Sequence, residues 1–508
     1  MPAAIAIVQS CALVGVDALG VDVECVVQGG QLPSYTVVGL ATQSVREGAA
    51  RIRSALRACG HDLPLKRVTI NLAPADLRKN GSALDLPIAL AVLVADKLAD
   101  GAALDRVLVL GELGLDGALR RVPGVLAAAM FARDRGMRGI LVPEACASEA
   151  LVVDGLEIYA ARTVGEIIAQ LGPDGALRPA TAANGAPRRR TRRADRVDMA
   201  EVRGQSLARL AVEIAVAGGH NVLLSGPPGT GKTMLARRIS TVLPAMTRDE
   251  ALETTKVYSS LGLADGLVGE RPFRAPHHTI SGAALLGGGS EPRAGEISLA
   301  HNGVLFLDEL PEFARAAIEG LRQPLEERAV TINRVHGALR LPASFLLVAA
   351  ANPCPCGWLD SPTRECICSA GAIDRYRARL SGPLLDRIDL QVHVEPVKLA
   401  ELRSAAPTES SADVRARVVA ARERQRARLA PWGLRCNAEM TASILRACCA
   451  LDPPCEAELA ELVERRRVVT ARGVDRLIKT ARTIADLLGQ DAIDPGALRE
   501  AAAFRTAA

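Results

Sequence analysis

The feature that most constrains this chain is a glycine-rich run between a short apolar segment and a helical one. Residues 221–225 predict a buried strand before the run, and residues 234–239 predict the first turns of a helix after it. Glycines let backbone N–H groups converge on phosphate oxygens, and the helix N-terminus adds a favourable dipole. The run matches the P-loop pattern G-x-x-x-x-G-K-[ST] and consists of Gly226, Pro227, Pro228, Gly229, Thr230, Gly231, Lys232 and Thr233.

Two residues of the run have distinct roles in the nucleoside triphosphate site that it predicts. Lys232 is expected to reach the β- and γ-phosphates, and the Thr233 hydroxyl is expected to bind Mg²⁺. The alternative is a glycine- and proline-rich turn that contains a lysine by chance, and the flanking strand and helix argue against it. We therefore expect ATP and Mg²⁺ as cofactors.

Two further apolar segments end in polar residues, as the other strands of an ATPase sheet do. Residues 302–309 end in Asp308 and Glu309, about 75 residues after the P-loop. Asp308 is expected to hold Mg²⁺ through water, and Glu309 to polarise the water that attacks the γ-phosphate. Residues 346–352 end in Asn352, which is expected to bond the γ-phosphate or that water. The alternative for Asn352 is a turn-forming role before Pro353.

An arginine in the segment 384–389 is a candidate for stabilising transition-state charge on a neighbouring subunit's nucleotide. We assign this role to Arg387. The alternative is a local salt bridge with Asp386 or Asp389, and Arg375 and Arg379 are rival candidates for the same role.

The chain after about residue 398 has an almost purely helical pattern rich in Ala, Arg and Leu. Its segment 470–476 offers Arg472 or Arg476 as a second nucleotide sensor, and we favour Arg472. The alternative is a solvated helix face.

Composition limits the broad class. A length of 508 residues suggests about three domains. Hydrophobic residues make up 49% but aromatic residues only 2%, so the cores must be built from aliphatic side chains. The net charge of +5 is too small to indicate nucleic acid by itself. The absence of a run of ~18 apolar residues argues against a membrane span. Without a basic, apolar leader the chain is expected to be cytoplasmic, with its twelve cysteines reduced.

The pattern of segments predicts four parts. Residues 1–175 alternate strands and helices, and residues 176–203 form a linker with an arginine-rich run at 188–193. The linker is expected to be a solvated spacer, with contact to DNA phosphates as the alternative. Residues 204–397 form the α/β nucleotide-binding domain with a parallel sheet, and residues 398–508 form a helical lid.

The order and spacing of these parts resemble AAA+ ATPases. Three stretches, residues 271–281, 295–303 and 381–389, look like those of magnesium-chelatase-like AAA+ proteins of the ComM (YifB) type, and the resemblance extends over nearly the whole chain. The resemblance implies a homo-hexameric ring and DNA branch migration during natural transformation. It also implies an insertion at about 271–289 and a hairpin at about 330–341. DNA contacts are then expected from Arg274, Arg334 and His336.

Residues 1–175 resemble the α+β proteolytic domain of Lon-type peptidases, which uses a serine and a lysine. Aligning the glycines puts the nucleophile position on Ala83 and the lysine position on Leu126. Neither side chain can act as nucleophile or base. Ser82 is one residue off, and the second matching stretch supplies no lysine. We therefore expect no peptidase activity, and a domain that stacks subunits or guides DNA.

Four cysteines follow Asn352 within 15 residues: Cys354, Cys356, Cys366 and Cys368. Four thiolates suit tetrahedral zinc, and reduced structural thiols are the alternative. The neighbouring His277 and His278 could suggest a metal, but adjacent side chains point apart. A loop that faces DNA or a neighbouring subunit is the better interpretation of this pair.

Two other motor functions compete with movement on DNA. A chelatase-type motor is expected to lack the Lon-like domain and to need a partner with a D-x-S-x-S loop. A protein unfoldase is expected to carry an aromatic pore-loop residue about 25–30 residues after the P-loop lysine. Tyr258 lies at that distance, although residues 256–260 also fit an ordinary helix.

Overall fold

A computed structural model describes residues 5–29, 32–79, 81–172, 175–180, 197–289, 293–334, 337–361, 364–402, 408–466 and 470–505. The chain divides into two compact units. The N-terminal unit combines Met1–Arg190 with Arg248–Gly269, and the P-loop unit combines Thr191–Thr247 with Glu270–Ala508.

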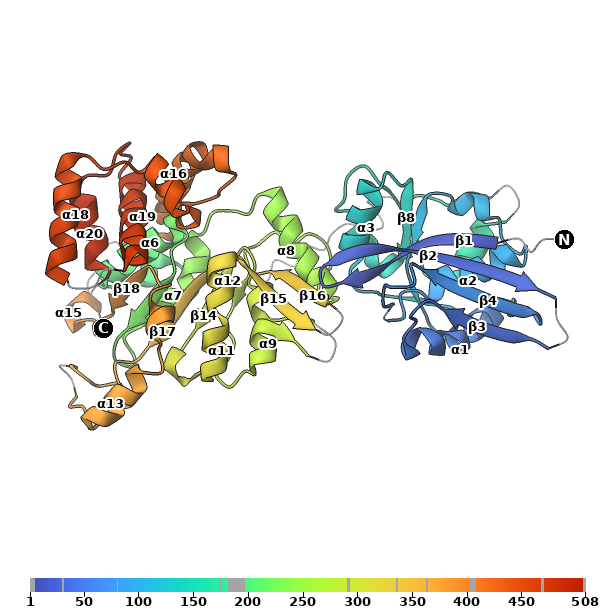
Figure 1. Cartoon of the computed structure of the whole chain (residues 1–508), viewed down its shortest axis with the longest axis horizontal. Helices are drawn as coiled ribbons and strands as arrows, with labels where there is room; N and C mark the ends of the chain where they lie inside the picture. Colours follow the sequence, from blue (N-terminus) through green and yellow to red (C-terminus); the bar gives the residue numbers. More distant parts are fainter. Residues whose placement is uncertain are drawn as a thin grey trace. The chain divides into compact units, whose positions relative to one another are not determined.

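The N-terminal unit is built on a four-stranded sheet in the order β1-β2-β4-β3 (Figure 1). The long strands β1 (Ile5–Val14) and β2 (Asp17–Gln28) pair antiparallel, because the two-residue connection at 15–16 allows an immediate return. β3 (Ser34–Val38) runs parallel to β4 (Arg67–Ala73), and α1 (Gln43–Ala58) connects the two.

A second, parallel sheet in the order β5-β8-β9 completes this unit. Its core is almost entirely aliphatic, as the low aromatic content predicted, with Tyr159 as an aromatic member. Helix α2 (Asp85–Ala95) is fully buried over most of its length and so carries no polar face. The remaining elements are α2 (Asp85–Ala95), β5 (Val107–Val109), β6 (Glu112–Leu113), β7 (Leu119–Arg120), α3 (Val125–Asp134), β8 (Gly139–Pro143), α4 (Ala147–Ala150), β9 (Glu157–Ala161) and α5 (Val164–Gln170).

Helix α8 (Arg248–Ser260) belongs to the N-terminal unit although it follows the P-loop helix in sequence. Leu252 joins an apolar cluster with Ala83 and Leu126. The Ser259 hydroxyl bonds the buried carboxylate of Glu149, whose pKa is raised by burial. The sequence analysis placed residues 248–269 in the nucleotide-binding domain, and the structure packs them on the Lon-like one.

The P-loop unit contains a five-stranded parallel sheet in the order β11-β14-β17-β10-β18. The three middle strands are apolar along nearly their whole length and buried on both faces, which is typical of parallel sheets covered by helices. The strands are β10 (Val222–Ser225), β11 (Phe273–Arg274), β14 (Val304–Leu307), β17 (Leu346–Ala351) and β18 (Leu390–His393).

Helices surround this sheet, and the C-terminal ones share its core. Apolar side chains of α6, α7, α16, α19 and α20 pack in one cluster with the sheet strands. Side-chain caps define where the C-terminal helices begin: Ser410 with Asp413 for α16, Thr470 for α19 and Asp494 for α20. The helices are α6 (Ser206–Gly218), α7 (Lys232–Val242), α11 (Arg315–Gly320), α12 (Arg322–Glu327), α13 (Ala370–Arg377), α14 (Gly382–Leu385), α15 (Leu399–Leu402), α16 (Ser411–Leu429), α17 (Ala442–Cys448), α18 (Pro453–Arg466), α19 (Ala471–Leu487) and α20 (Pro495–Ala503).

Two excursions leave the sheet of the P-loop unit. The first contains α9 (Gly282–Leu286), β12 (Gly287–Gly288), β13 (Arg293–Ala294) and α10 (Glu296–Leu299). The second is the hairpin of β15 (Ala329–Arg334) and β16 (Gly337–Pro342), which lies in sequence between β14 and β17.

The end of the predicted linker is ordered structure rather than a spacer. Met199, in the short helix Met199–Glu201, is fully buried in the core of the P-loop unit. The carboxylate of Asp198 accepts bonds from the backbone N–H groups of Ala200 and Ser411. The arginine-rich run at 188–193 lies outside the described residues. Within the described part of the chain, no helix combines the length and apolarity that crossing a membrane requires.

Candidate nucleotide-binding site

The P-loop lies between β10 and α7 and has the backbone conformation that phosphate binding needs. Gly229 and Gly231 have φ values of +78° and +88°, in the left-handed region that favours glycine. At Gly226 an added Cβ would lie 2.3 Å from the carbonyl oxygen of Val394, so only glycine fits this close approach. The loop is also closed by the Thr230 hydroxyl, which donates to the carbonyl of Pro227 (3.0 Å).

Lys232 is buried, and its ammonium group points back into the loop. Its Nζ donates to the carbonyl oxygens of Gly226 (2.6 Å) and Pro227 (2.8 Å), and to Oδ1 of Asn352 (3.2 Å). Burial lowers its pKa, and the nearby carboxylates of Asp308 and Glu309 act in the opposite direction. The structure therefore brings Lys232 and Asn352, 120 residues apart in sequence, to one point.

The predicted magnesium ligands also meet. The Thr233 hydroxyl donates to Oδ2 of Asp308 (2.7 Å). Because β10 and β14 flank β17 and all three strands run parallel, their carboxyl ends reach the same edge of the sheet. A hydroxyl and a carboxylate oxygen are the hard ligands that Mg²⁺ takes.

Glu309 follows Asp308 in a left-handed backbone conformation (φ +53°), which turns its side chain away from the strand direction. Its backbone N–H donates to Oδ1 of Asp308 (3.0 Å). Its Oε2 lies 3.3 Å from Nδ1 of His278, a contact that the sequence analysis did not foresee. His278 therefore lies beside the predicted catalytic carboxylate.

The two favoured arginines converge on one carboxylate that the sequence analysis missed. Oε1 of Glu326 lies 2.6 Å from Nη2 of Arg387 and 3.2 Å from Nη1 of Arg472. Arg387 is nearly buried and Arg472 is 62% exposed. Arg387 thus pairs with neither Asp386 nor Asp389 as its side-chain partner. To reach a phosphate it must first leave Glu326.

The rival arginines lie elsewhere. Arg379 pairs with Glu312 (2.8 Å), and Arg375 is exposed on α13. Arg476 pairs with the buried Asp389 (3.1 Å).

Asp389 is the centre of a buried polar network at the amino ends of β10 and β18. Its Oδ2 accepts from the backbone N–H of Asn221 (2.9 Å), and its Oδ1 faces Arg476. Burial raises the pKa of this carboxyl, but His220, Arg476 and the Asn221 N–H outweigh burial and hold the pKa below its usual range. The network ties the start of β10 to the lid helix α19.

The four predicted cysteines gather at one point. The Sγ–Sγ distances are 3.4 Å for Cys354–Cys356 and 3.6 Å for Cys354–Cys366 and for Cys356–Cys366. All four sulfur atoms lie within 4.8 Å of one another. Zinc at ~2.3 Å from each of four sulfurs would space them roughly 3.8 Å apart, so the donor set fits this ion.

The cysteine loop packs on the P-loop. A Cβ added to Gly357 would lie 2.7 Å from two ring carbons of Pro228, and the φ of Gly357 is +84°. Cys354 is fully buried only two residues after Asn352. The cysteine loop therefore lies against the predicted nucleotide site.

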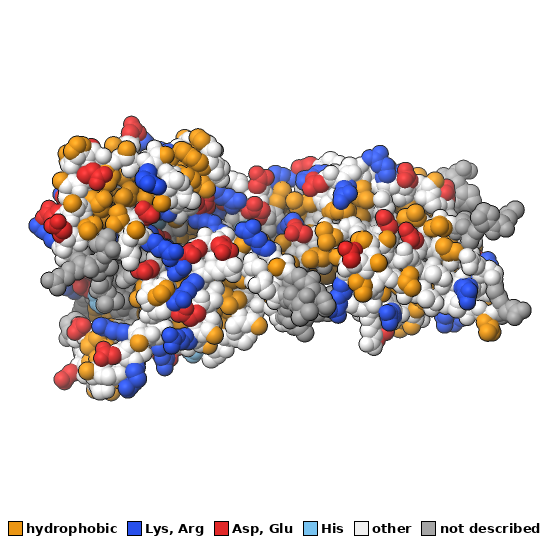
Figure 2. All heavy atoms as spheres, viewed as in Figure 1, with side chains coloured by type: hydrophobic (Ala, Val, Ile, Leu, Met, Phe, Trp, Pro, Cys, Tyr) orange, Lys and Arg blue, Asp and Glu red, His pale blue; other side chains and the backbone are white. Residues whose placement is uncertain are grey.

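The predicted DNA residues are only partly described. Arg274 forms two bonds of 2.6 Å to the carboxylate of Glu296. β15 ends at Arg334. The side chain of Arg334 and the whole of His336 lie outside the described residues. On the face drawn in Figure 2, basic and acidic side chains are interspersed over both units.

The degenerate peptidase positions lie in apolar surroundings. Leu126 is fully buried, and its backbone N–H donates to Glu149 (2.8 Å). Ala83 packs in the same apolar cluster, and the Ser82 hydroxyl is bonded to Glu112. Alanine and leucine side chains supply neither nucleophile nor base.

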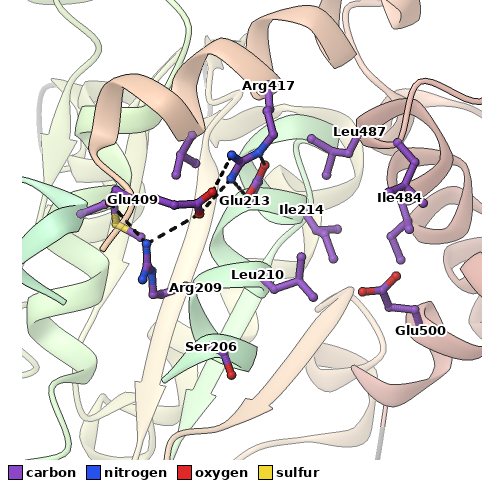
Figure 3. A pocket seen from close by; sticks show the side chains of 13 residues that line it. Ser206, Arg209, Leu210, Glu213, Ile214, Glu409, Arg417, Ile484, Leu487 and Glu500 are labelled. Carbon is purple, nitrogen blue, oxygen red and sulfur yellow. Dashed lines mark hydrogen bonds and ion pairs between the residues drawn. The ribbon is translucent and has the colours of Figure 1, made fainter. Parts of the chain in front are cut away.

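A cavity of about 370 Å³ opens between α6 and the C-terminal helices (Figure 3). Leu210, Ile214 and Ile484 line it, while Arg417 points toward Glu213 and bonds it at 2.6 and 2.9 Å. Arg417 also bonds Glu409 and thereby lowers the pKa of that carboxyl. The lid is held to α6 by ion pairs over this cavity.

Comparison with known proteins places this site in a family. Two models cover the P-loop unit: "Magnesium chelatase, subunit ChlI" matches residues 198–402, and "Magnesium chelatase, subunit ChlI C-terminal" matches residues 408–505. A third, "Subunit ChlI of Mg-chelatase", matches residues 23–146. The sequence analysis expected chelatase motors to lack a domain like the N-terminal one. The model that matches this segment is itself described as a chelatase subunit, so the segment does not separate this chain from chelatase motors.

Two relatives match almost from end to end. YifB of Escherichia coli is 42% identical over 99% of this chain and 97% of its own length. The competence protein ComM of Haemophilus influenzae is 40% identical over the same shares. The chain belongs to the magnesium-chelatase-like ComM family. It is therefore an AAA+ ATPase with a Lon-like N-terminal unit.

Two further relatives are similar to part of this chain. Lon protease 2 of Bacillus subtilis is 28% identical over 30% of this chain and 32% of its own length. The Holliday junction branch migration complex subunit RuvB of Saccharopolyspora erythraea is 31% identical over 40% of this chain and 46% of its own length.

Proposed function

We propose that this protein is a magnesium-dependent ATPase that works as a homo-hexameric ring and moves on DNA. The class of movement we favour is branch migration during recombination or natural transformation. The similarity to a competence protein and to a subunit of a Holliday junction branch migration complex supports this proposal.

The observation that carries the proposal is the place of the β15–β16 hairpin. It interrupts the connection between β14, which is followed by Asp308 and Glu309, and β17, which is followed by Asn352. A force that DNA exerts on the hairpin is therefore transmitted to β14 and β17, the two strands that are followed by the proposed hydrolytic residues. Tyr258, by contrast, lies in helix α8 of the N-terminal unit, which weakens the pore-loop argument for an unfoldase.

In the proposed reaction each polar group of the site has one task. Lys232 exchanges the loop carbonyls for β- and γ-phosphate oxygens, and Asn352 orients the γ-phosphate or the water. Thr233 and Asp308 hold Mg²⁺, which neutralises phosphate charge when bound. Glu309 accepts the proton of the attacking water.

Replacing Arg274 and Arg334 together by Ala tests the DNA assignment. We expect weaker binding to forked DNA for all sequences alike and a smaller salt dependence, because fewer phosphates are neutralised. DNA-stimulated hydrolysis should be lost while basal hydrolysis persists. Fluorescence anisotropy over a salt series measures the binding.

Replacing Arg340 on β16 by Ala is a matched control, because this change removes one charge of the hairpin at a position away from its tip. Binding by the double variant as tight as wild type at every salt concentration would contradict the DNA assignment. Wild-type hydrolysis that responds to unfolded polypeptide and not to DNA would favour the unfoldase.

We propose that Cys354, Cys356, Cys366 and Cys368 hold one zinc ion per chain. Replacing Cys354 and Cys366 by Ser should release it, because two of four ligands are lost. Elemental analysis of untagged protein measures the metal, and Cys448→Ser is the control, since this thiol lies in α17. Metal content unchanged in the double variant would contradict the site.

We propose that Arg387 stabilises transition-state charge on a neighbouring subunit and that Arg472 senses nucleotide from the lid. Mixing Arg387→Ala protein with Lys232→Ala protein should restore part of the activity, because mixed interfaces contain some complete sites. Verified mixed rings that remain inactive would place Arg387 within its own subunit's site.

A further inference from the structure

Glu326, near the end of α12, holds the two proposed nucleotide arginines on one carboxylate. Its Oε1 lies 2.6 Å from Nη2 of Arg387 and 3.2 Å from Nη1 of Arg472. Among the described residues, no other carboxylate forms an ion pair with either arginine. The side chain of Arg387 is only 10% exposed, and its Nη1 donates to the carbonyl oxygen of Pro383 (2.5 Å). Both terminal nitrogens of Arg387 are therefore engaged within its own chain.

Helix α12 is fixed against the segment that carries Arg387. Nη2 of Arg322 donates to the hydroxyl of Ser381 (3.0 Å), the residue before α14. Side chains four residues apart lie on the same face of a helix, so α12 presents Arg322 and Glu326 together to the segment 381–387. The place of the Glu326 carboxylate relative to Arg387 is therefore set by α12.

Glu326 also lies directly before the β15–β16 hairpin. Only Glu327 and Arg328 separate it from the first residue of β15. Arg328 turns the chain with a φ of +53°, and its carbonyl oxygen accepts the N–H of Ala343 (2.9 Å), the residue that follows β16. Because no loop separates α12 from the hairpin, a displacement of the hairpin is passed on to Glu326.

We propose that Glu326 is a positioning residue that restrains Arg387 and Arg472 until movement of the β15–β16 hairpin withdraws its carboxylate. A carboxylate and a phosphate compete for the same guanidinium nitrogens. While Glu326 holds Arg387, this arginine stabilises less of the transition-state charge on a neighbouring subunit's nucleotide. The proposal rests on the proposed function for the roles of the two arginines and for DNA as the ligand that moves the hairpin.

The test is steady-state ATP hydrolysis by Glu326→Gln, with and without forked DNA. Glutamine keeps the size of the side chain and removes the charge that holds the arginines. We expect the basal kcat to rise roughly two- to tenfold, the range set by one hydrogen bond. DNA should then stimulate hydrolysis less than it does in wild type. The matched control is Glu327→Gln, which changes the neighbouring exposed carboxylate of α12 and should leave both rates unchanged.

A double-mutant cycle tests whether Glu326 acts through Arg387. Arg387→Ala alone should lower the kcat. Adding Glu326→Gln to this variant should not raise the kcat again, because the arginine to be released is gone. A rise by the same factor as in the wild-type background would show that Glu326 acts by another route and would overturn the proposal.

The remaining outcomes separate the restraint from the DNA function. A basal kcat of Glu326→Gln at or below that of wild type, in protein with wild-type thermal stability, overturns the proposal, and so does undiminished stimulation by DNA. If Glu326→Gln does not fold, Glu326→Asp decides by the same criteria, because it keeps the charge and withdraws the carboxylate by one methylene group. If DNA does not stimulate the wild type but Glu326→Gln raises the basal kcat through Arg387, the restraint stands and the DNA function falls.

Discussion

Glu309→Gln is expected to reduce ATP turnover by at least ~100-fold, the lower range for loss of a general base. Nucleotide binding should persist, because Lys232, Thr233 and Asp308 keep their positions and contacts. Phosphate release under saturating ATP measures turnover, and a fluorescent nucleotide measures binding.

Lys232→Ala gives the contrasting defect. Loss of the ammonium removes the charge that faces the β- and γ-phosphates, so binding itself should weaken. The control is Glu327→Gln, which changes an exposed carboxylate on α12 and should behave as wild type. Hydrolysis by Glu309→Gln at the wild-type rate would show that another group activates the water.

Asp389→Ala is expected to destabilise the P-loop unit by about 3–5 kcal/mol, the range for breaking a buried ion pair. The change leaves Arg476 and the N–H of Asn221 without their acceptor. Thermal or urea unfolding measures the loss. Asp386→Ala, three residues earlier and only partly buried, should change stability by no more than ~0.5 kcal/mol.

The difference in unfolding free energy between wild type and Asp389→Ala should depend on pH in a definite direction. The folded-state pKa of Asp389 lies below that of the unfolded chain, which is ~3.9. The carboxylate therefore contributes its full stability above about pH 4 and loses it as pH falls through the folded-state pKa. The difference in unfolding free energy between wild type and Asp389→Ala should therefore become smaller in that acid range. A gap that is constant down to acid unfolding would contradict the network.

The local chemistry of the nucleotide site could be predicted from the sequence because each part is contiguous. A P-loop needs glycine conformations and a following helix, and residues 226–233 contain both requirements. The apolar strands that come directly before Asp308 and Asn352 are recognisable by their own composition. Parallel order then brings their carboxyl ends together. The spacing of the four cysteines likewise permitted a cluster, and the structure gathers them.

Partners that join distant segments could not be predicted. Nothing in the segment around Glu326 indicates that it pairs with Arg387 and Arg472. The sequence offered Asp386 or Asp389 only as alternative partners of Arg387. His278 and Glu309 belong to separate motifs, and only their placement at one sheet edge brings them to 3.3 Å. The packing of α8 on the N-terminal unit also joins segments far apart in the chain, and it could not be predicted either.

The sequence by itself determined the P-loop conformation, the aliphatic cores and the order of elements, because these depend on backbone conformation and periodicity within short segments. The tertiary structure alone decided which charges pair, which histidine meets Glu309, and which unit holds α8. Those outcomes depend on burial and on geometry between segments far apart in the chain, which local patterns do not encode.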